Sequence, residues 1–180
     1  MDDSSKIVRV LIRATPQGLR LIELGLWPEE EFSCSGAVVY SIQASLQGDL
    51  SHHEMEMLQE DLSAYFSGQP VNFLRYPVDW QNMTPFGRKV LDLARSIPWG
   101  ETRNYGWLSA QLKLPGGARA VGSALGRNPV PIVIPCHRVL RKDGQMGGFS
   151  AGIQWKRFLL DLEGNASIKT RIEFLGTVIK

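Results

Sequence analysis

The first half of the chain changes from an alternating to a helical pattern of apolar residues. Apolar and polar side chains alternate from Val8 to Ile12, and the apolar run resumes after the turn residues 16–18, which predicts a β-hairpin. Residues 51–54 carry the Ser-x-x-Glu capping-box pattern, and apolar residues then recur at helical spacing as far as Gly68. The pattern therefore predicts two strands followed by a helix.

The second half is predicted to be mostly helical. Thr84 before Pro85 is typical of a helix start, because the hydroxyl caps free amides and proline fits the first turn. This helix is expected to end before Pro98 and to bury one apolar stripe, made of Phe86, Val90, Leu93 and Ile97.

Two short helices are predicted next, over 104–112 and 118–125, around a tight turn at 114–117. They resemble a helix-turn-helix, although many helical hairpins with this pattern do not bind DNA. A last helix is predicted over 153–163, with Ile153 on its apolar stripe. The tail beyond it is expected either to add a strand or to pack on the surface.

These elements predict an α+β fold in two lobes. Residues 1–80 are expected to form an N-terminal α/β lobe with a small antiparallel sheet and a helix. Residues 81–180 are expected to form a mostly helical C-terminal domain that contains the helix-turn-helix. The segment 69–83 has no sustained period and is expected to link the two lobes.

The net charge of +2 conceals a strong asymmetry along the chain. Residues 1–85 hold 5 Lys/Arg against 12 Asp/Glu, a net charge of −7. Residues 86–142 hold 10 Lys/Arg against 2 Asp/Glu, a net charge of +8. Such a segment suits a polyanionic partner, although an ordinary solvated basic face would look the same.

The cellular compartment is suggested by what the sequence lacks. No stretch approaches the roughly 18 apolar residues of a membrane span, and the acidic first residues do not suit a secretory signal. The chain has two cysteines, Cys34 and Cys136, so no disulfide framework is expected. We expect an intracellular protein without membrane association, cytoplasmic or, in a eukaryote, nuclear.

Cys136 and His137 form the strongest candidate for chemistry. A thiol with a pKa near 8.5 is mostly protonated at neutral pH, so a nucleophilic cysteine needs a base or a positive field. His137 is suited to act through a bridging water, and Glu163 is the candidate to hold its tautomer, because it ends the helix that folds back over the loop. Taken by itself, the adjacency more often reflects a buried cysteine beside a core histidine.

A longer pattern surrounds this pair. The segment 128–139, Asn-Pro-Val-Pro-Ile-Val-Ile-Pro-Cys-His-Arg-Val, resembles the signature of the O6-alkylguanine-DNA alkyltransferases, also called methylated-DNA-protein-cysteine methyltransferases. The resemblance continues at the following segments: 84–86, 97–105, 118–122, 148–150 and 162–164. It covers residues 65–164 well and the first 60 residues only weakly.

The resemblance implies a role for particular residues. Cys136 would accept the alkyl group irreversibly in a single turnover, His137 and Glu163 would activate it, and Tyr105 would donate a proton to the leaving guanine. Arg119 would fill the gap left by the flipped nucleotide. The other residues implied at the DNA are Ala118, Gly122, Ser123 and Arg127. Those implied at the substrate pocket are Asn128, Val139, Phe149 and Ser150, with Phe149 standing where many members have tyrosine.

The implied partner is double-stranded DNA that contains O6-alkylguanine, with O4-alkylthymine as a secondary substrate. We expect a monomer without a cofactor. No metal is expected either, because Cys34, His52 and His53 do not form the set of zinc ligands found in some members. Three alternatives remain open at this stage: a Cys/His hydrolase or acyltransferase, a non-catalytic lesion sensor, and a DNA-binding regulator that uses the helix pair alone.

Overall fold

The computed structural model describes residues 6–25, 39–48, 51–165 and 171–179. Cys34 lies outside these ranges. The strands are β1 (Lys6–Thr15), β2 (Gly18–Leu24), β3 (Val39–Gly48), β4 (Arg103–Asn104), β5 (Val139–Leu140) and β6 (Arg171–Ile179). The helices are α1 (His52–Phe66), α2 (Pro85–Arg95), α3 (Tyr105–Gln111), α4 (Ala118–Leu125) and α5 (Ile153–Leu160), with short turns η1 (Phe73–Arg75), η2 (Cys136–Arg138) and η3 (Asp161–Asn165).

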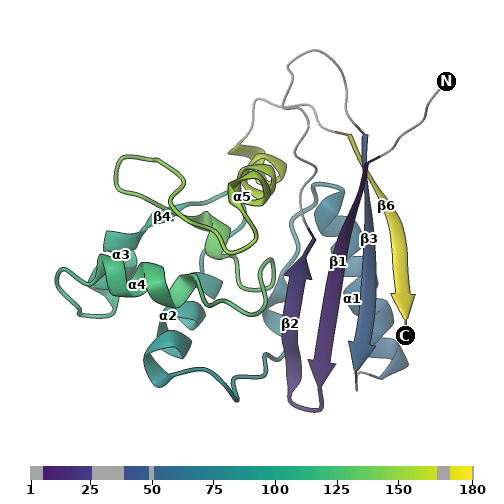
Figure 1. Cartoon of the computed structure of the whole chain (residues 1–180), viewed down its shortest axis with the longest axis horizontal. Helices are drawn as coiled ribbons and strands as arrows, with labels where there is room; N and C mark the ends of the chain where they lie inside the picture. The colour runs from purple at the N-terminus through teal and green to yellow at the C-terminus, as the bar shows by residue number, and fades with distance from the viewer. Residues whose placement is uncertain (1–5, 26–38, 49–50, 166–170, 180) are drawn as a thin grey trace.

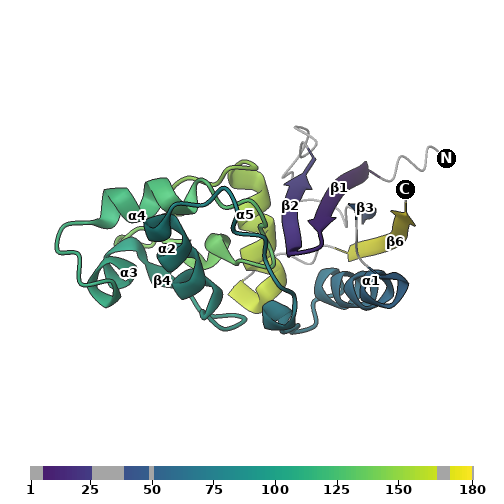
Figure 2. The same cartoon turned by 90° about the horizontal axis from the view of Figure 1, so that it is seen from below.

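One lobe is a four-stranded sheet with a helix on one face (Figures 1 and 2). The strand order is β2-β1-β3-β6. The predicted hairpin is confirmed as the antiparallel pair β1–β2, whereas β1–β3 and β3–β6 are parallel. The expected antiparallel sheet is thus limited to the hairpin. The last strand, β6, follows the helical lobe in sequence but pairs within the sheet of the first lobe.

The predicted capping box at the start of α1 is present. Ser51 Oγ accepts from the Glu54 amide, and the Glu54 carboxylate accepts from the Ser51 amide. These contacts satisfy amides that the first turn of a helix leaves unpaired. Leu58 and Leu62 are fully buried and belong to the same hydrophobic core as β1 and β2. The helix therefore covers the sheet and closes this lobe.

The second lobe is helical, and α3 and α4 pack together as predicted (Figure 1). The start of α2 at Pro85 is confirmed, with Thr84 Oγ1 accepting from the Gly87 amide. The predicted stripe of α2 is only partly correct. Phe86 is exposed and Leu93 half-buried, while Leu91 and Ala94 are buried. The buried positions 87, 90, 91 and 94 form one helical stripe, which is rotated relative to the predicted one toward Leu91.

The last helix follows its predicted pattern, which included Lys156, Phe158 and Leu159, only in part. These three residues are buried, whereas Ile153 is 41% exposed and Trp155, outside the predicted pattern, is fully buried. The chain continues from α5 into the turn η3 and reverses at Gly164, whose φ is 91°. This left-handed conformation favours glycine. Gly164 follows directly after Glu163, whose carboxylate contacts His137 and Arg138 of the Cys136 segment.

The sheet lobe directly supports the segment before Cys136. The Ile22 amide of β2 donates to the Pro129 carbonyl at 2.8 Å, which joins the sheet to this segment. The Leu19 amide of β2 donates to the Pro77 carbonyl at 2.8 Å, which joins the sheet to the linker 69–83. The Trp155 indole of α5 donates to the Gly25 carbonyl at 2.7 Å. The two lobes are therefore joined by hydrogen bonds as well as by a shared core.

Candidate active site

Cys136 lies at the wall of a cavity of about 340 Å³. It is the first residue of η2, and its side chain is 5% exposed. The cavity is bounded by α3, α4 and the loop before α5. The residues lining it are Tyr105, Gly122, Leu125, Gly126, Cys136, Gly148, Phe149 and Ser150. Four of the predicted site residues thus meet here with the thiol: Tyr105, Gly122, Phe149 and Ser150.

Asn128 braces the loop that carries Cys136. Its side-chain nitrogen donates to the Ile134 carbonyl at 2.8 Å and to Cys136 Sγ at 3.0 Å. Its side-chain oxygen accepts from the Val130 amide at 3.1 Å. A buried amide with both ends bonded holds the loop in one geometry. The same loop contains Ile132 at a φ of 75°, an uncommon conformation for a β-branched residue.

Glu163 is the centre of a buried hydrogen-bond network. Its Oε1 lies 2.8 Å from His137 Nε2 and accepts from Tyr65 Oη at 2.8 Å and from Arg138 Nη2 at 2.9 Å. Its Oε2 accepts from Arg138 Nε at 2.8 Å, and Arg138 Nη1 donates to the Ile97 carbonyl. Glu163, His137 and Tyr65 are 3%, 0% and 0% exposed. The network places the predicted pair His137–Glu163 in direct contact.

The ionisation of this network fixes the histidine tautomer. Burial acts to raise the pKa of Glu163, but the hydrogen bonds and charges of His137 and Arg138 outweigh it and lower the pKa to about 2. Burial lowers the pKa of His137, so the neutral ring is favoured at neutral pH. An ionised carboxylate only accepts, so His137 Nε2 carries the proton. His137 Nδ1 is then a proton acceptor, and it is buried without a partner in the described part of the chain.

Lys156 is a buried cation beside the thiol. It is fully buried in α5, and Nζ donates to the Val139 carbonyl at 2.6 Å and lies 6.0 Å from the centre of the Tyr105 ring. Burial lowers the pKa of Lys156 to about 8. Burial raises the pKa of the Cys136 thiol, while the Asn128 hydrogen bond and the Lys156 charge act in the opposite direction. The surroundings therefore hold two groups that favour a thiolate.

Tyr105 closes the other side of the cavity from the start of α3. Asn104 caps that helix, because its side-chain oxygen accepts from the Trp107 amide at 2.9 Å. This cap fixes Tyr105 as the first residue of the helix. Gly147 has a φ of 66°, and a Cβ there would lie 2.7 Å from Tyr105 Oη. Glycine at 147 thus lets the loop approach the hydroxyl. Burial raises the pKa of Tyr105, so it remains a phenol at neutral pH.

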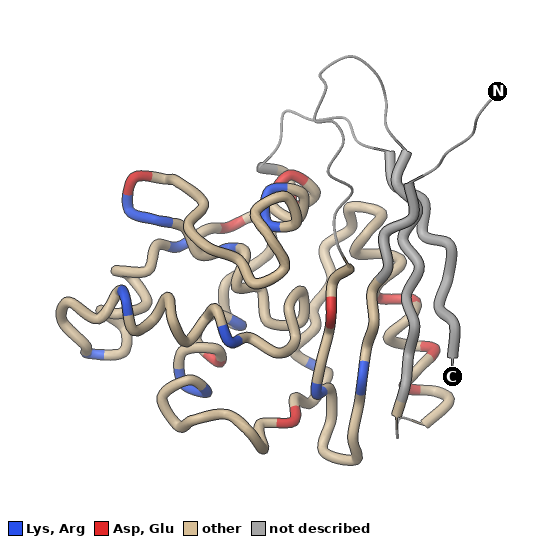
Figure 3. Tube along the Cα trace, in the orientation of Figure 1, with Lys and Arg blue, Asp and Glu red and all other residues tan. Residues whose placement is uncertain are grey.

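The residues predicted to meet DNA lie along and beside α4. Arg119, Ser123 and Arg127 are exposed, while Ala118 and Gly122 are half-buried. Figure 3 shows lysines and arginines spread over the helical lobe, and acidic residues on α1 of the sheet lobe. One of the ten basic residues counted for segment 86–142 does not contribute to this surface, because Arg138 is buried and bonded to Glu163.

Two residues expected at the substrate pocket, Asn128 and Val139, are buried and do not line the cavity. The resemblance also implied that Asn128 braces the turn before Cys136, and its hydrogen bonds agree with that role. The Val139 carbonyl accepts from Lys156. The site also contains functional candidates that the sequence reasoning missed. They are Tyr65 and Lys156, to which the burial of Arg138 against Glu163 is added. The position of Lys156 in an otherwise apolar helix pattern was the available signal, since a buried lysine needs a partner.

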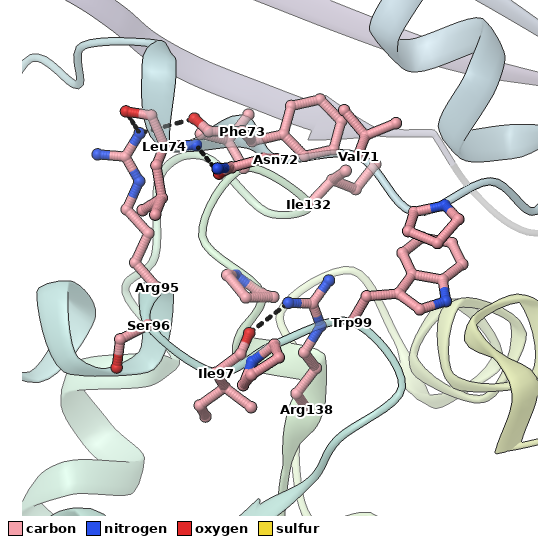
Figure 4. A pocket seen from close by; sticks show the side chains of 14 residues that line it. Val71, Asn72, Phe73, Leu74, Arg95, Ser96, Ile97, Trp99, Ile132 and Arg138 are labelled. Atoms are coloured by element: carbon pink, nitrogen blue, oxygen red, sulfur yellow. Dashed lines mark hydrogen bonds between the residues drawn. The ribbon is translucent and has the colours of Figure 1, made fainter.

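A second cavity, of about 400 Å³, lies between the linker residues 70–74 and residues 95–99 (Figure 4). Ile132, Trp99 and Arg138 line it, but Cys136 does not. Of the two, the smaller cavity is therefore the one that borders the Cys136 thiol. Within the described ranges, no group of three His, Cys, Asp or Glu residues is placed to hold a metal ion. No helix among the described residues is long and apolar enough to cross a membrane.

The stability of the fold is expected to depend on Glu163 at acid pH. Its pKa falls from 4.5 to about 2 on folding, so its contribution is complete above pH 4.5 and is lost as the pH falls through 2. The free energy of unfolding should therefore fall between pH 4.5 and 2, and less steeply in Glu163→Gln. Urea unfolding of both proteins across this window measures the two slopes. If the free energy of unfolding fell equally steeply with pH in both proteins, the lowered pKa of Glu163 would not contribute to stability.

Comparisons with known proteins agree with this geometry. Residues 85–165 match the family model described as 6-O-methylguanine DNA methyltransferase, DNA binding domain. A methylated-DNA–protein-cysteine methyltransferase of Methanopyrus kandleri is 46% identical over 110 residues, which are 61% of this chain and 81% of that protein. The chain belongs to the methylated-DNA–protein-cysteine methyltransferase family.

The similarity to other members extends over different lengths. The family member of Mycobacterium tuberculosis strain H37Rv is 44% identical over 104 residues, which are 58% of this chain and 62% of that protein. The matched region thus spans less than two thirds of that relative. The crystal structure of Mycobacterium tuberculosis OGT in complex with DNA matches with a TM-score of 0.65 at 29% identity, covering 88% of this chain and 93% of that one. This family fold confirms the predicted α+β class.

Proposed function

We propose that this chain repairs DNA by transferring the alkyl group of O6-alkylguanine to Cys136 Sγ. The observation that carries the proposal is the position of the thiol. It lies at the wall of a cavity bordered by α4, the helix that carries the exposed Arg119, and next to a buried His137–Glu163 pair. A candidate nucleophile, a candidate base and the helix proposed to face DNA are thus neighbours. The family membership and the DNA complex of the Mycobacterium tuberculosis relative support the same assignment.

Thiolate formation is the first step of the proposed reaction. His137 Nδ1 is buried, lacks a protein partner in the described structure and is the free acceptor of the ring. It can take the thiol proton through one bridging water, and the imidazolium that forms is stabilised by Glu163. Asn128 and Lys156 favour the thiolate that remains. The relay thereby offsets the burial that would otherwise keep Cys136 protonated.

Alkyl transfer then exchanges one bond for another. The bond between Sγ and the alkyl carbon forms as the bond between that carbon and O6 breaks, and the electron pair passes to the purine. Tyr105 lines the cavity and remains a phenol at neutral pH, so it can donate its proton to a ring nitrogen of the leaving guanine. Phe149 and Leu125 provide apolar surface for the flipped base. The Ser150 amide is proposed to approach O6.

Access to the cavity requires the nucleotide to leave the duplex. We propose that α4 lies against double-stranded DNA and that Arg119, exposed near its start, occupies the vacated position in the stack. Gly122, Ser123 and Arg127 would lie along the same contact. O4-alkylthymine, which presents a similar alkyl ether, is proposed as a secondary substrate, with the protein acting as a monomer.

The product is a thioether, which is a very poor leaving group, so each molecule should act once. Incubation with a duplex that contains O6-methylguanine should raise the intact mass of the protein by one methyl group per molecule, and peptide mapping should place it at Cys136. An unchanged mass, or more than one lesion repaired per molecule, would contradict the proposal. Turnover would instead favour a hydrolase.

Glu163→Gln is expected to slow alkyl transfer and to raise the apparent pKa of Cys136. The neutral amide stabilises an imidazolium less than a carboxylate does, and each unit of thiol pKa corresponds to about 1.4 kcal/mol of thiolate stabilisation. Titrating the thiol of both proteins by its ultraviolet absorbance measures the shift. An unchanged titration would remove Glu163 from the mechanism.

A further inference from the structure

Tyr65 is contributed to the buried network by the other lobe. It is fully buried near the end of α1, in the lobe that contains the sheet. Its hydroxyl donates to Glu163 Oε1 at 2.8 Å, and the Tyr65 hydroxyl oxygen lies 3.5 Å from His137 Nε2. The remaining members of the network, Glu163, His137 and Arg138, come from the helical lobe. One side chain of α1 thus reaches the group that activates Cys136.

The ring of Tyr65 is fixed by aromatic neighbours. Trp99, Phe66 and Phe73 meet it edge to face, with ring centroids at 5.1, 5.5 and 5.5 Å. Trp99 also borders the cavity between the linker and residues 95–99, near Arg138 (Figure 4). A ring packed on several sides keeps one rotamer. The hydroxyl is therefore held in place before any substrate binds.

The Tyr65 hydroxyl acts as a hydrogen-bond donor to Glu163. Burial raises the pKa of Tyr65 well above its ordinary value, and the charge of Glu163 adds to the effect, so the group stays a phenol. It donates to Oε1, the oxygen that also contacts His137. The carboxylate is thus restrained from both sides, by Arg138 from the helical lobe and by Tyr65 from the sheet lobe. Rotation of Glu163 would break the contact that orients the histidine.

We propose that Tyr65 is a positioning residue for alkyl transfer, and that the sheet lobe acts through it on the reactivity of Cys136. Tyr65 touches neither the thiol nor the cavity, so its effect passes through Glu163 and His137. The inference rests on the proposed function, because a positioning role in alkyl transfer requires Cys136 to be the alkyl acceptor. The orientation of the relay can nevertheless be measured on the thiol without DNA.

The chain offers a matched control. Tyr76 is also buried, and its hydroxyl donates to the Asp61 carboxylate at 2.7 Å, away from the relay. Tyr65→Phe and Tyr76→Phe each remove one hydroxyl that bonds a carboxylate. Both changes are expected to lower stability by a similar mechanism. Only Tyr65→Phe removes a contact of Glu163.

The test compares the two variants in a Cys34→Ser background, in which Cys136 is the only thiol. The rate of alkylation by iodoacetamide is measured across pH without DNA, and single-turnover transfer is measured at saturating duplex. Tyr65→Phe should raise the apparent pKa of Cys136 and slow transfer about tenfold, the effect of one lost hydrogen bond to a charged group. Tyr76→Phe should change neither, and DNA affinity should be equal in both.

Two results would overturn the inference. One is a thiol titration of Tyr65→Phe that coincides with that of Tyr76→Phe. The other is slower transfer without any change in the pH dependence, which a merely structural role would produce. Thermal unfolding confirms that both variants are folded at the assay temperature. If neither the parent nor the variants transferred alkyl groups, the proposed function would fail while the thiol titration still decided the role of Tyr65.

Discussion

Cys136→Ser is expected to abolish alkyl transfer while leaving DNA binding intact. The serine hydroxyl has a pKa far above that of a thiol, so the His137–Glu163 relay cannot generate an alkoxide at neutral pH. The side chain is small and lines the cavity rather than the exposed side of α4 that carries Arg119 and Ser123, so the DNA contact should persist. Transfer of a labelled alkyl group from duplex DNA and the affinity for the same duplex measure the two properties.

Cys34→Ser is the matched control for this loss, because it removes the other cysteine of the chain. It should retain full transfer, with the label on the peptide that contains Cys136. A label that mapped to Cys34, or a Cys136→Ser protein that still removed the label from DNA, would refute the assignment of the acceptor.

Arg119→Ala should slow repair of duplex DNA by about tenfold or more. Unstacking a base costs a few kcal/mol, and losing the side chain that fills the gap lowers the flipped population accordingly. Free O6-alkylguanine needs no flipping, so its rate should be almost normal, and a single strand should be intermediate. The three rates are compared at one salt concentration, because salt strongly changes the affinity for DNA.

Lys142→Ala provides a control for charge alone, because Lys142 is an exposed cation on a different loop. It should weaken DNA binding modestly. The ratio of the rate on duplex DNA to the rate on free O6-alkylguanine should remain that of the parent protein. A similar loss on all three substrates in Arg119→Ala would assign this residue to the cavity or the fold. Small and equal effects would mean that Arg119 is an ordinary surface cation.

Much of the local structure followed from the sequence. The capping box at Ser51, the Thr84–Pro85 helix start and the cap at Asn104 depend on contacts within a few residues, so sequence spacing specifies them. The hairpin of β1 and β2 is local for the same reason. The pairing of His137 with Glu163 was also predicted, from the expectation that the last helix folds back, and the structure confirms the contact at 2.8 Å.

The tertiary structure alone decided which distant groups complete the site. Tyr65 is separated from Glu163 by 98 positions, and no local pattern marks the hydroxyl that bonds it. Arg138 belongs by sequence to a basic segment, yet it is buried against Glu163 because that carboxylate needs a cationic partner. Lys156 occupies a helix position where only packing shows that it faces the Val139 carbonyl rather than solvent.

The same distinction applies to the sheet. The alternation of apolar and polar residues predicts strands, but it does not predict which strands pair. The parallel pairing of β6 with β3 joins segments more than a hundred residues apart. The order of the strands depends on which sheet edges remain free after the chain has folded. The sequence by itself determined the short-range elements, the family motif and the candidate pair Cys136–His137, because these depend on neighbouring residues. The tertiary structure decided the lobe pairing and the electrostatic surroundings of Cys136, because burial and long-range contacts set both.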